Sequence, residues 1–514
     1  MTTHQHIHIA DIAVTRPNGV TETLCVSDTP LRPFAHTDPD RPNAVYRARI
    51  VGLPSWQTDL YADPARLAGS VGGGSLLLAS ADGALAYLRG CLIGRIVIRR
   101  GWEGLPWGQW EVLVAATGEA PRWTVSDRTP TRMEIPLWDA RALLDRDVQT
   151  ATYGGTNVGA AGLDGEYGLA GKVKPLLLGD MSTGFVPAVW ANGPARIAQL
   201  SAVGIGALTG IYDRGGDTSI ALAGDYPGTL PSATLTSVQA GTDRAAGLVR
   251  LGGATGGDVQ FGTLGPAAAG TTAPAIAAWL LARAGVAGAE IGATVAGLAA
   301  PAPCGLYLGD KTAYRPQVER LSRSWGGWLV PDRLGVWQAG LLSEPAAPVI
   351  TITDNGIVQL EVDEADAMLP VKSVAVTWGE TVTTLTRDAL VPSARETPRE
   401  AWLKEQSRTA KATDLRVAGR RDARELVVDT ALRTEAPAQA LAARLLSVLG
   451  LRADGEPRMS LRVAVEATSV RLAVPLGAAV RLVYPSEGID RVMTLMGYRL
   501  WSPRDHLVWW RLFG

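Results

Sequence analysis

Residues 153–190 read YGGTNVGAAGLDGEYGLAGKVKPLLLGDMSTGFVPAVW, and the stretch changes character halfway along. Its first half is rich in glycine and almost uncharged, which suits a loop with positive φ angles and close backbone approaches. The apolar runs 176–178 and 185–190 then have the composition of strands, and the segment 179–184 between them predicts a turn. We therefore expect the two runs to pair as a hairpin. The whole stretch is interpreted as a joint between β-rich domains or a loop that docks on a neighbouring subunit, and a flexible linker has equal support.

The chain of 514 residues is too long for a single hydrophobic core. Apolar residues make up 46% of it, and its 58 glycines and 32 prolines are typical of many short strands joined by turns. The sequence predicts a multidomain, mainly β fold with α+β parts, in which β-barrel or sandwich domains carry a few helices. Four domains are expected: a β-barrel-like domain at 1–150, a β-rich domain with the glycine-rich connector at 151–270, an α+β domain at 271–365, and a β-rich domain with one helix at 366–514.

Alternating apolar residues and turn signals place the individual elements. Strands are expected at 7–14, 44–51, 92–99, 110–116, 132–137, 371–378, 460–465, 479–483, 491–499 and 507–512. Helices are expected at 275–284, 314–325 and 436–449, each ending next to glycine, with a short one at 139–147. A hairpin is predicted over 328–339, a strand at 382–386 that returns along 371–378, and an extended, exposed excursion over 392–424.

Charge and cysteine content exclude several classes of protein. The net charge of -1 gives no bulk attraction to nucleic acid or anionic lipid. The three cysteines, Cys25, Cys91 and Cys304, lie far apart and are expected to be buried free thiols. The first residues lack the features of a signal peptide, and no apolar run reaches the ~18 residues of a membrane helix. We therefore expect a soluble protein made in the cytoplasm, without stable membrane insertion.

The residues that could carry chemistry do not form a recognisable catalytic motif. His4, His6 and His8 alternate, so a strand would place them on one face, but no fourth ligand for Zn²⁺ is indicated and no metal site is predicted. The glycines of 204–210 resemble a dinucleotide fingerprint but lead into a turn instead of a helix. The acidic cluster of Glu361, Asp363, Glu364 and Asp366 is interpreted as a solvated loop. The sequence predicts no catalytic, cofactor-binding or metal-binding residue, and no enzyme.

Tryptophan is unusually frequent, with 16 residues against four phenylalanines. Trp102, Trp107 and Trp110 lie close enough in sequence to form a platform for sugar rings, which supports an alternative function as a carbohydrate-binding or cell-wall-degrading protein. Exposed rings along a groove would favour that function, whereas rings buried in the core or between chains would favour a structural protein. Trp325 and Trp328 flank the predicted helix-to-hairpin turn, and replacing either by alanine is expected to impair folding or assembly.

Several phrases of the sequence resemble a known family. They are GRIVIRRG at 94–101, LLDRDVQTATYGGT at 143–156, GLAGKVKPLLLG at 168–179, VPAV at 186–189, YDRG at 212–215, AGLVRLGG at 246–253, LSRSWGGWLVPDRLGVW at 321–337 and APAQALAARLLSVLG at 436–450. Together they resemble hub proteins at the tail tip or baseplate of tailed bacteriophages and related prophages. The resemblance covers nearly the whole chain and consists of structural motifs.

This resemblance implies a structural virion protein at the tail tip, a homotrimer whose barrel-like domains close the end of the tail tube. Two tube-like domains per chain would give a pseudo-sixfold ring that the genome crosses during ejection without specific binding. The implied partners are a distal tail or tube protein, the tape measure protein, and a central spike or fibre that attaches to the host. The chain lacks the cysteines of tail-tip proteins that hold an iron–sulfur cluster, so no cofactor is implied. A hub of a contractile injection system remains an equal interpretation.

Overall fold

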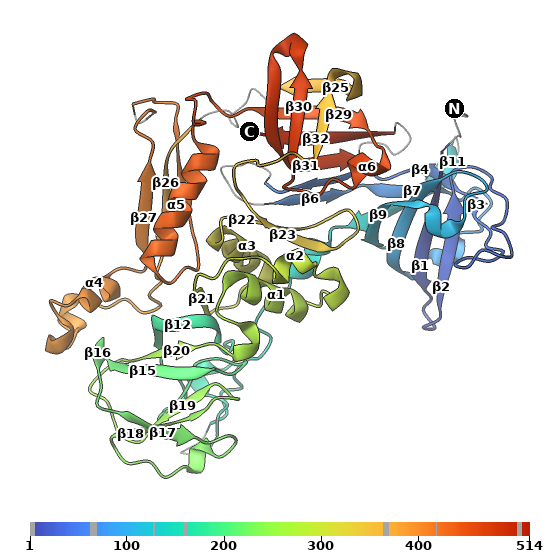
Figure 1. The fold of residues 1–514 in the computed structure, drawn as a ribbon. Coiled ribbons are helices and arrows are strands. Elements are labelled where there is room, and N and C mark those ends of the chain that lie inside the picture. Colours follow the sequence, from blue (N-terminus) through green and yellow to red (C-terminus); the bar gives the residue numbers. More distant parts are fainter. Residues whose placement is uncertain are drawn as a thin grey trace.

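The computed structural model describes residues 6–61, 69–126, 129–157, 162–362, 370–417, 419–500 and 506–514. The molecule is built from several β-sheets with a few helices between them, which confirms the predicted fold class (Figure 1). In Figure 1 the first sheet lies at the right, two small sheets lie at the bottom, and the last barrel-like sheet lies at the top. Short helices α1, α2 and α3 occupy the centre, where these parts meet.

The first sheet forms a nearly closed barrel, in which the single residue Arg49 connects the two end strands. Its strand order is β3-β2-β1-β8-β9-β11-β7-β4, with β10 beside β11. The end strands β3 and β4 are separated only by Arg49, whose N–H donates to the carbonyl of Ser27 at 2.8 Å and whose carbonyl accepts from Ala79 at 2.7 Å. The strands are β1 Ile7–Thr15, β2 Thr21–Ser27, β3 Arg47–Ala48, β4 Ile50–Gly52, β7 Ser75–Ala79, β8 Leu92–Gly101, β9 Glu111–Gly118, β10 Arg122–Ser126 and β11 Thr129–Trp138.

The last large sheet curls in the same way and takes a hairpin from the first part of the chain. Its order is β24-β30-β31-β32-β29-β25, and its end strands are joined by the single turn Asp354–Gly356. The far half of β31 pairs with β5, which pairs with β6, so Gly497 lies opposite Asp59. The strands are β24 Ile350–Thr353, β25 Ile357–Val362, β29 Ser460–Glu466, β30 Ala479–Tyr484, β31 Ile489–Leu500, β32 Leu507–Phe513, β5 Trp56–Asp59 and β6 Ser70–Gly73.

Two five-stranded sheets pack on each other to form the unit at the bottom of Figure 1, with Phe261 and Val249 in their shared core. The first has the order β16-β15-β20-β12-β21 and the second β13-β14-β19-β18-β17. The strands are β12 Leu176–Pro187, β13 Val189–Asn192, β14 Ile197–Gln199, β15 Ala207–Asp213, β16 Gly216–Asp217, β17 Ala221–Asp225, β18 Gln239–Asp243, β19 Leu248–Leu251, β20 Val259–Leu264 and β21 Gly305–Leu308.

The predicted hairpin between 176–178 and 185–190 is wrong. Residues Leu176–Pro187 form one strand, β12, which pairs with β20 and β21, and the following strand β13 pairs with β14. Gly179 is needed for a close approach and not for a turn, because a Cβ there would collide with the backbone of Cys304. The irregularity lies instead between Met181 and Val186, where Phe185 has a φ of 48°.

The helices agree closely with the sequence patterns. The predicted helices are α1 Ala273–Arg283, α3 Tyr314–Ser324 and α5 Glu435–Leu449, and the predicted hairpin is β22 Gly327–Pro331 with β23 Trp337–Leu341. The remaining α-helices are α2 Ala293–Ala296, α4 Pro398–Lys404 and α6 Ser469–Leu472. Short 3-10 helices lie at Ala86–Leu88, Trp107–Gln109, Ala140–Asp145, Tyr167–Leu169, Leu230–Ser232, Ala267–Ala269, Gly288–Glu290, Arg387–Ala389, Pro392–Ala394 and Pro485–Glu487.

The region after residue 371 differs from the prediction in its pairings. Strand β26, Val371–Trp378, pairs with β27 at Arg408–Thr413 and β28 at Arg424–Val428, so the returning strand expected at 382–386 is wrong. Leu385 of that segment instead packs with Phe185 of β12. The excursion 392–424 contains α4 and β27 and is not extended throughout. The helix expected at 139–147 is the 3-10 helix Ala140–Asp145.

One hydrophobic core runs through most of these parts. It joins Ile12 of the first barrel, Leu321 of α3, Val376 of β26 and Leu512 of β32, all fully or nearly fully buried. The apolar C-terminal strand is packed as expected, with Phe513 only 4% exposed. The division of the chain at 150, 270 and 365 stays a prediction, although the pairing of β5 with β31 links the first and last of the four segments directly.

Candidate functional site

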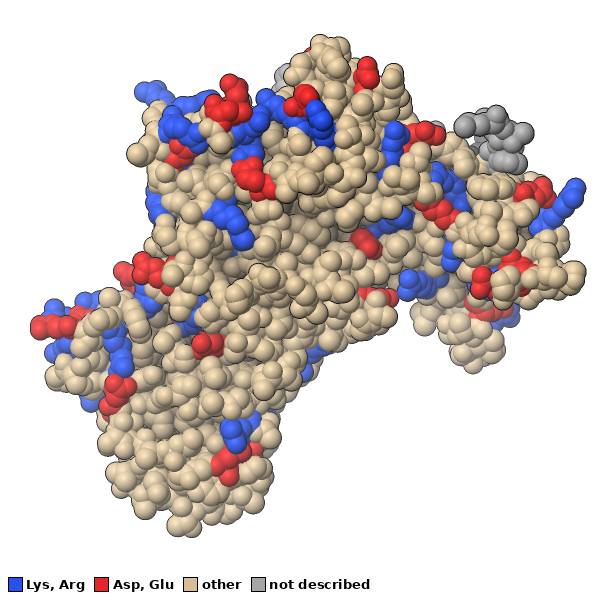
Figure 2. All heavy atoms as spheres, in the orientation of Figure 1, with Lys and Arg blue, Asp and Glu red and all other residues tan. Residues whose placement is uncertain are grey.

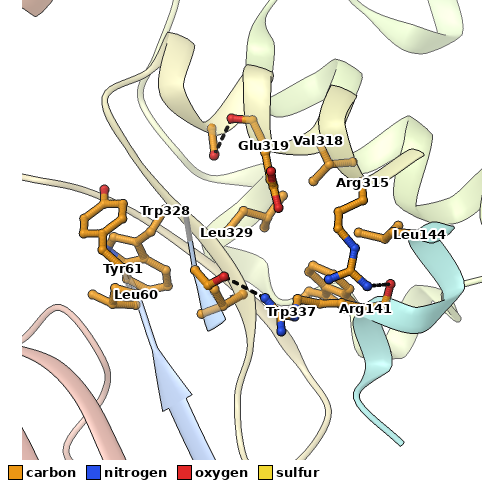
Figure 3. A pocket seen from close by; sticks show the side chains of 13 residues that line it. Leu60, Tyr61, Arg141, Leu144, Arg315, Val318, Glu319, Trp328, Leu329 and Trp337 are labelled. Atoms are coloured by element: carbon orange, nitrogen blue, oxygen red, sulfur yellow. Dashed lines mark hydrogen bonds between the residues drawn. The ribbon is translucent and has the colours of Figure 1, made fainter. Parts of the chain in front are cut away.

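The candidate site is a joint at which segments distant in the sequence meet (Figure 3). The joint is formed by the end of β5, the 3-10 helix Ala140–Asp145, helix α3 and the hairpin β22–β23. Its apolar lining is provided by Leu60, Tyr61, Leu144, Val318, Trp328 and Trp337.

The joint is filled by side chains. Trp328 is 6% exposed and Trp337 is 1% exposed, and the Trp328 ring lies beside Leu60 and Tyr61 (Figure 3). Trp328 lies against Gly340 and Gly477, where any added Cβ would collide with its ring. The remaining cavity measures about 20 Å³, which is room for a single water molecule. The joint is therefore a structural connection and offers no space for a substrate.

Two arginines, Arg141 and Arg315, form hydrogen bonds along the polar side of the joint. Arg141 donates to the carbonyl of Gly69 at 2.7 Å, to that of Val71 at 3.1 Å and to Asp139 at 2.6 Å. Arg315 of α3 donates twice to Asp145 at 2.7 Å. These bonds tie the 3-10 helix to strand β6 on one side and to α3 on the other.

Arginines also connect parts of the molecule outside the joint. Arg100 of β8 donates to Glu111 and, at 2.6 Å, to the carbonyl of Ala467, which joins the first barrel to the last sheet. Arg333 in the β22–β23 turn donates to the carbonyls of Val112 and Leu113 on β9. Because the donors are charged and the acceptors partly or fully buried, each contact is stronger than an ordinary surface hydrogen bond.

Arg433 is the most deeply buried of these connecting arginines. It donates to the carbonyl of Glu380 at 2.7 Å and to the hydroxyl of Thr183 at 3.1 Å, so it ties the last segment to β12. Burial lowers the pKa of Arg433 to about 10, with the nearby carboxylate of Glu380 opposing the shift. The side chain therefore stays charged at neutral pH. The sequence does not single out these arginines, because many of their acceptors are backbone carbonyls or side chains far away in the chain.

Two of the three N-terminal histidines lie beside His506, and His4 lies outside the described residues. His8 belongs to β1 and His6 directly precedes that strand, and their ring centroids lie 6.3 and 4.7 Å from that of His506. His8 is held by Asp28, with 2.8 Å between Nδ1 and Oδ2, and burial lowers the pKa of His6. Within the described ranges, no three histidine, cysteine or acidic side chains are arranged to hold a metal ion.

The three tryptophans proposed as a sugar platform do not form one. Trp110 is 2% exposed and belongs to a small core with Phe34 and Tyr46. The ring of Trp107 is covered by the guanidinium of Arg99, whose Cζ lies 3.9 Å from its centroid. Only Trp102 is largely accessible, at 38% exposure. These neighbours in sequence are separated because Trp110 directly precedes β9 and packs into this small core, whereas Trp102 directly follows the end of β8.

The remaining candidates have structural explanations. Cys91 and Cys304 are buried free thiols as predicted, whereas Cys25 is a free thiol that is only half-buried. Burial raises the pKa of the Cys304 thiol to about 12 and that of the Cys25 thiol to about 11. The glycines of 204–210 lead into strand β15, as expected for a segment without a phosphate-binding helix. Glu361 lies on strand β25 and not in a loop, and Asp363, Glu364 and Asp366 lie outside the described residues.

A search of the described residues finds no helix with the length and apolar character needed to cross a membrane.

Comparisons with known proteins give only distant structural similarity. No protein-family model matches the chain, and no curated protein matches it in sequence. Three solved structures are similar over 98% of this chain. A tail protein from Neisseria meningitidis MC58 is 11% identical, is covered over 96% of its own chain and has a TM-score of 0.37; the 43 kDa tail protein of prophage MuSo2 from Shewanella oneidensis is 9% identical, is covered over 98% and has a TM-score of 0.38. The prophage tail protein gp18 from Listeria monocytogenes EGD-e is 10% identical, is covered over 94% of its own chain and has a TM-score of 0.35.

Proposed function

We propose that this chain is a structural protein of a bacteriophage virion, a trimeric hub at the tail tip or baseplate. Three copies would form a ring that closes the distal end of the tail tube and connects it to the central spike or fibres. The genome would cross this ring during ejection. The proposal places the protein in contact with the distal tail or tube protein and the tape measure protein, and it assigns no enzymatic role.

The observation that carries the proposal is the presence of two curled sheets in one chain. In one, Arg49 bridges the end strands, and in the other the turn Asp354–Gly356 joins the end strands. Three chains with two such units each would present six around a central axis, which suits contact with a sixfold tube. The family resemblance of the sequence points to the same assembly.

The hydrogen bonds that connect the units are those expected of a protein that transmits mechanical force between its neighbours in the tail. Arg100, Arg141, Arg333 and Arg433 fix the barrels, the helices and β12 to one another through buried or half-buried bonds. Figure 2 shows basic and acidic side chains interspersed on the face in view, so this face carries no continuous basic surface for tight phosphate contacts.

The proposal is tested by measuring mass and location. Light scattering of the purified chain should give three times the 54.1 kDa chain mass, and electron microscopy should show rings with threefold symmetry. Immunogold labelling of phage particles from the source strain should place the protein at the distal end of the tail. A monomer at every concentration together with unlabelled particles would contradict the proposal.

A further inference from the structure

The last sheet carries an open groove of about 540 Å³ on the face opposite to its core. The groove is lined by side chains of β5, β25 and β32, among them Gln57, Asp59, Gln359, Glu361, Trp509 and Arg511. Its polar groups are engaged within the chain, since Gln57 donates to Asp59, Gln359 to Glu361, and Arg511 to the carbonyl of Tyr61. Another part of the same sheet contacts the first barrel through groups whose charge changes near neutral pH.

The guanidinium of Arg100 connects the first barrel to the last sheet. Arg100 lies on β8, is 7% exposed and donates to the carbonyl of Ala467, directly after β29, at 2.6 Å. It also donates to Glu111 of β9 at 2.6 Å. The N–H of Ala467 in turn donates to the carbonyl of His506 at 2.6 Å. The placement of this guanidinium therefore helps to decide whether the barrel stays attached to the sheet at Ala467.

His8 of β1 lies directly opposite Arg100 in the pairing of β1 with β8, so the two side chains share one face. The histidine is 1% exposed. Its Nδ1 lies 2.8 Å from Oδ2 of Asp28, and its backbone N–H donates to Oδ1 of the same carboxylate at 3.0 Å. Because a carboxylate accepts hydrogen bonds, Nδ1 carries the proton of the neutral ring, and Nε2 is the atom that takes up a further one.

A proton on Nε2 of His8 does not suit the observed packing. Nε2 is buried and has no hydrogen-bond partner among the described residues, so protonation would create a buried N–H without an acceptor. It would also place a positive charge directly opposite Arg100, and like charges at opposed positions of neighbouring strands are destabilising. Asp28 stabilises the cation on the Nδ1 side only. The arrangement around Arg100 therefore favours the neutral imidazole.

Further ionisable groups surround this pair. The ring centroid of His506 lies 6.3 Å from that of His8 and 4.7 Å from that of His6. Burial, with Arg100 and His8 adding to it, lowers the pKa of His6 against the opposing carboxylates Glu111 and Glu466. Because this shift is downward, the contribution of His6 to stability is complete at neutral pH and is lost as the pH falls below about 6.5.

The carboxylates near the contact do not obscure this range of pH. Carboxyl groups ordinarily titrate below about pH 5, whereas histidine titrates between about pH 5 and 8. Between pH 7.5 and 5.5 the change of charge at this contact therefore comes mainly from imidazoles. Arg504 and Asp505, which precede His506 in the sequence, lie outside the described residues.

We propose that His8, together with His6 and His506, forms a proton-operated release of the contact between the first barrel and the last sheet. At neutral pH the uncharged rings allow Arg100 to hold the carbonyl of Ala467. As the pH falls to 5.5, a proton from solvent binds Nε2 of His8, Arg100 is displaced, and the contact at Ala467 opens while both sheets stay folded. The release is a property of the single chain and is independent of the hub function.

Hydrogen–deuterium exchange of the full chain at pH 7.5 and 5.5, measured by mass spectrometry, tests the proposal. After correction for the intrinsic pH dependence of exchange, peptides that contain Ala467 should exchange at least about tenfold faster at pH 5.5. Peptides of α1, which contains the fully buried Leu280 and Leu281, should keep their protection. Unchanged protection at Ala467, or an equal loss of protection in α1, would overturn the proposal.

Variants identify the group that takes up the proton. His8→Asn keeps an N–H for Asp28 but does not titrate, so exchange at Ala467 should differ by less than about twofold between the two pH values. Arg100→Gln keeps a donor for Ala467 without the opposed charge and should reduce the acid response at least about threefold. His36→Asn is the matched control, because His36 is exposed and lies outside this contact.

Circular dichroism at pH 7.5 establishes that each variant is folded, and Arg100→Gln decides the matter if His8→Asn does not fold. The control should respond to acid as the wild type does. A wild-type acid response in the folded His8→Asn and Arg100→Gln variants, or loss of the response in His36→Asn, would overturn the assignment to His8.

Discussion

The joint and the groove are built from the same kinds of residue but have opposite properties. Both contain tryptophan and arginine, yet the joint retains about 20 Å³ and the groove about 540 Å³. In the joint, Arg141 directs its donors to backbone carbonyls and Trp328 packs against glycine backbone. In the groove, Trp509 and Arg511 lie beside alanine and glycine and line the open volume, and Arg511 also donates to the carbonyl of Tyr61 at 3.1 Å. Residue type alone therefore does not distinguish a connection from an open surface; what decides is whether the facing element fills the space.

The largest expected contrast is in access to a thiol reagent. Cys304 is fully buried with a pKa of about 12, so at pH 8 only about one thiol in ten thousand is ionised. A cysteine introduced by Gln359→Cys at the groove should ionise normally and react at least about a thousandfold faster. Labelling rates, read by mass spectrometry, measure the contrast.

Because the shift of Cys304 is upward, its labelling should stay slow up to about pH 9 and rise only as the pH approaches 12. The thiol also contributes to stability: the unfolded chain ionises first, so this contribution is present below about pH 9 and is lost as the pH rises towards 12. Rapid labelling of Cys304 in the native protein at pH 8 would show that the interior is more open than the structure indicates.

Replacing Trp328 or Trp509 by alanine should lower the free energy of unfolding by unequal amounts. Trp328→Ala leaves a cavity between the hairpin and the last sheet and should lower the free energy of unfolding by about 3–5 kcal/mol. Trp509→Ala removes a half-buried ring next to open space and should cost about 1 kcal/mol or less. Urea unfolding of both variants checks this. Similar losses would mean that the groove is as tightly packed as the joint.

The smallest expected contrast is the difference in stability between variants of Arg141 and Arg122. Arg141→Met keeps the aliphatic stem but removes three hydrogen bonds, and should cost about 2 kcal/mol because the carbonyls of Gly69 and Val71 lose their donor. Arg122→Met is the control, since that side chain is 68% exposed with one partner at 3.5 Å, and should change stability by less than about 0.5 kcal/mol. Equal melting temperatures in the two variants would remove Arg141 from the connections that hold the joint.

Local patterns in the sequence predict the elements well. Helix α3 ends before Gly326 and α5 before Gly450, as apolar spacing and glycine indicated, and the hairpin β22–β23 follows from its turn residues. Where the prediction failed, a long-range contact overrides the local signal. Gly179 looks like a turn residue in sequence, but it serves the approach of β12 to Cys304.

Neither the joint nor the groove is visible in the sequence, for the same physical reason. The joint depends on Arg141, which donates to the carbonyls of Gly69 and Val71, and on Arg315, which pairs with Asp145 170 positions away, and neither contact has a signature in the local sequence. The groove needs Asp59 to lie opposite Gly497, a pairing that no local periodicity encodes. The sequence instead drew attention to Trp102, Trp107 and Trp110 because they are close together in the chain. Their proximity in sequence did not predict a shared surface, because Trp110 is buried whereas Trp102 is exposed.

The pairing of β5 with β31 has a consequence for synthesis. Strand β5 leaves the ribosome early, but its partner around Gly497 is made near the end of the chain. At 5–20 residues per second, the hairpin β5–β6 waits roughly 20–90 s before its outer edge is covered. During that time one early strand keeps unpaired backbone groups while other copies are being made nearby. The last sheet is therefore completed only after β31 has been made and has paired with β5, so a chain that stops before residue 489 leaves this edge of β5 uncovered.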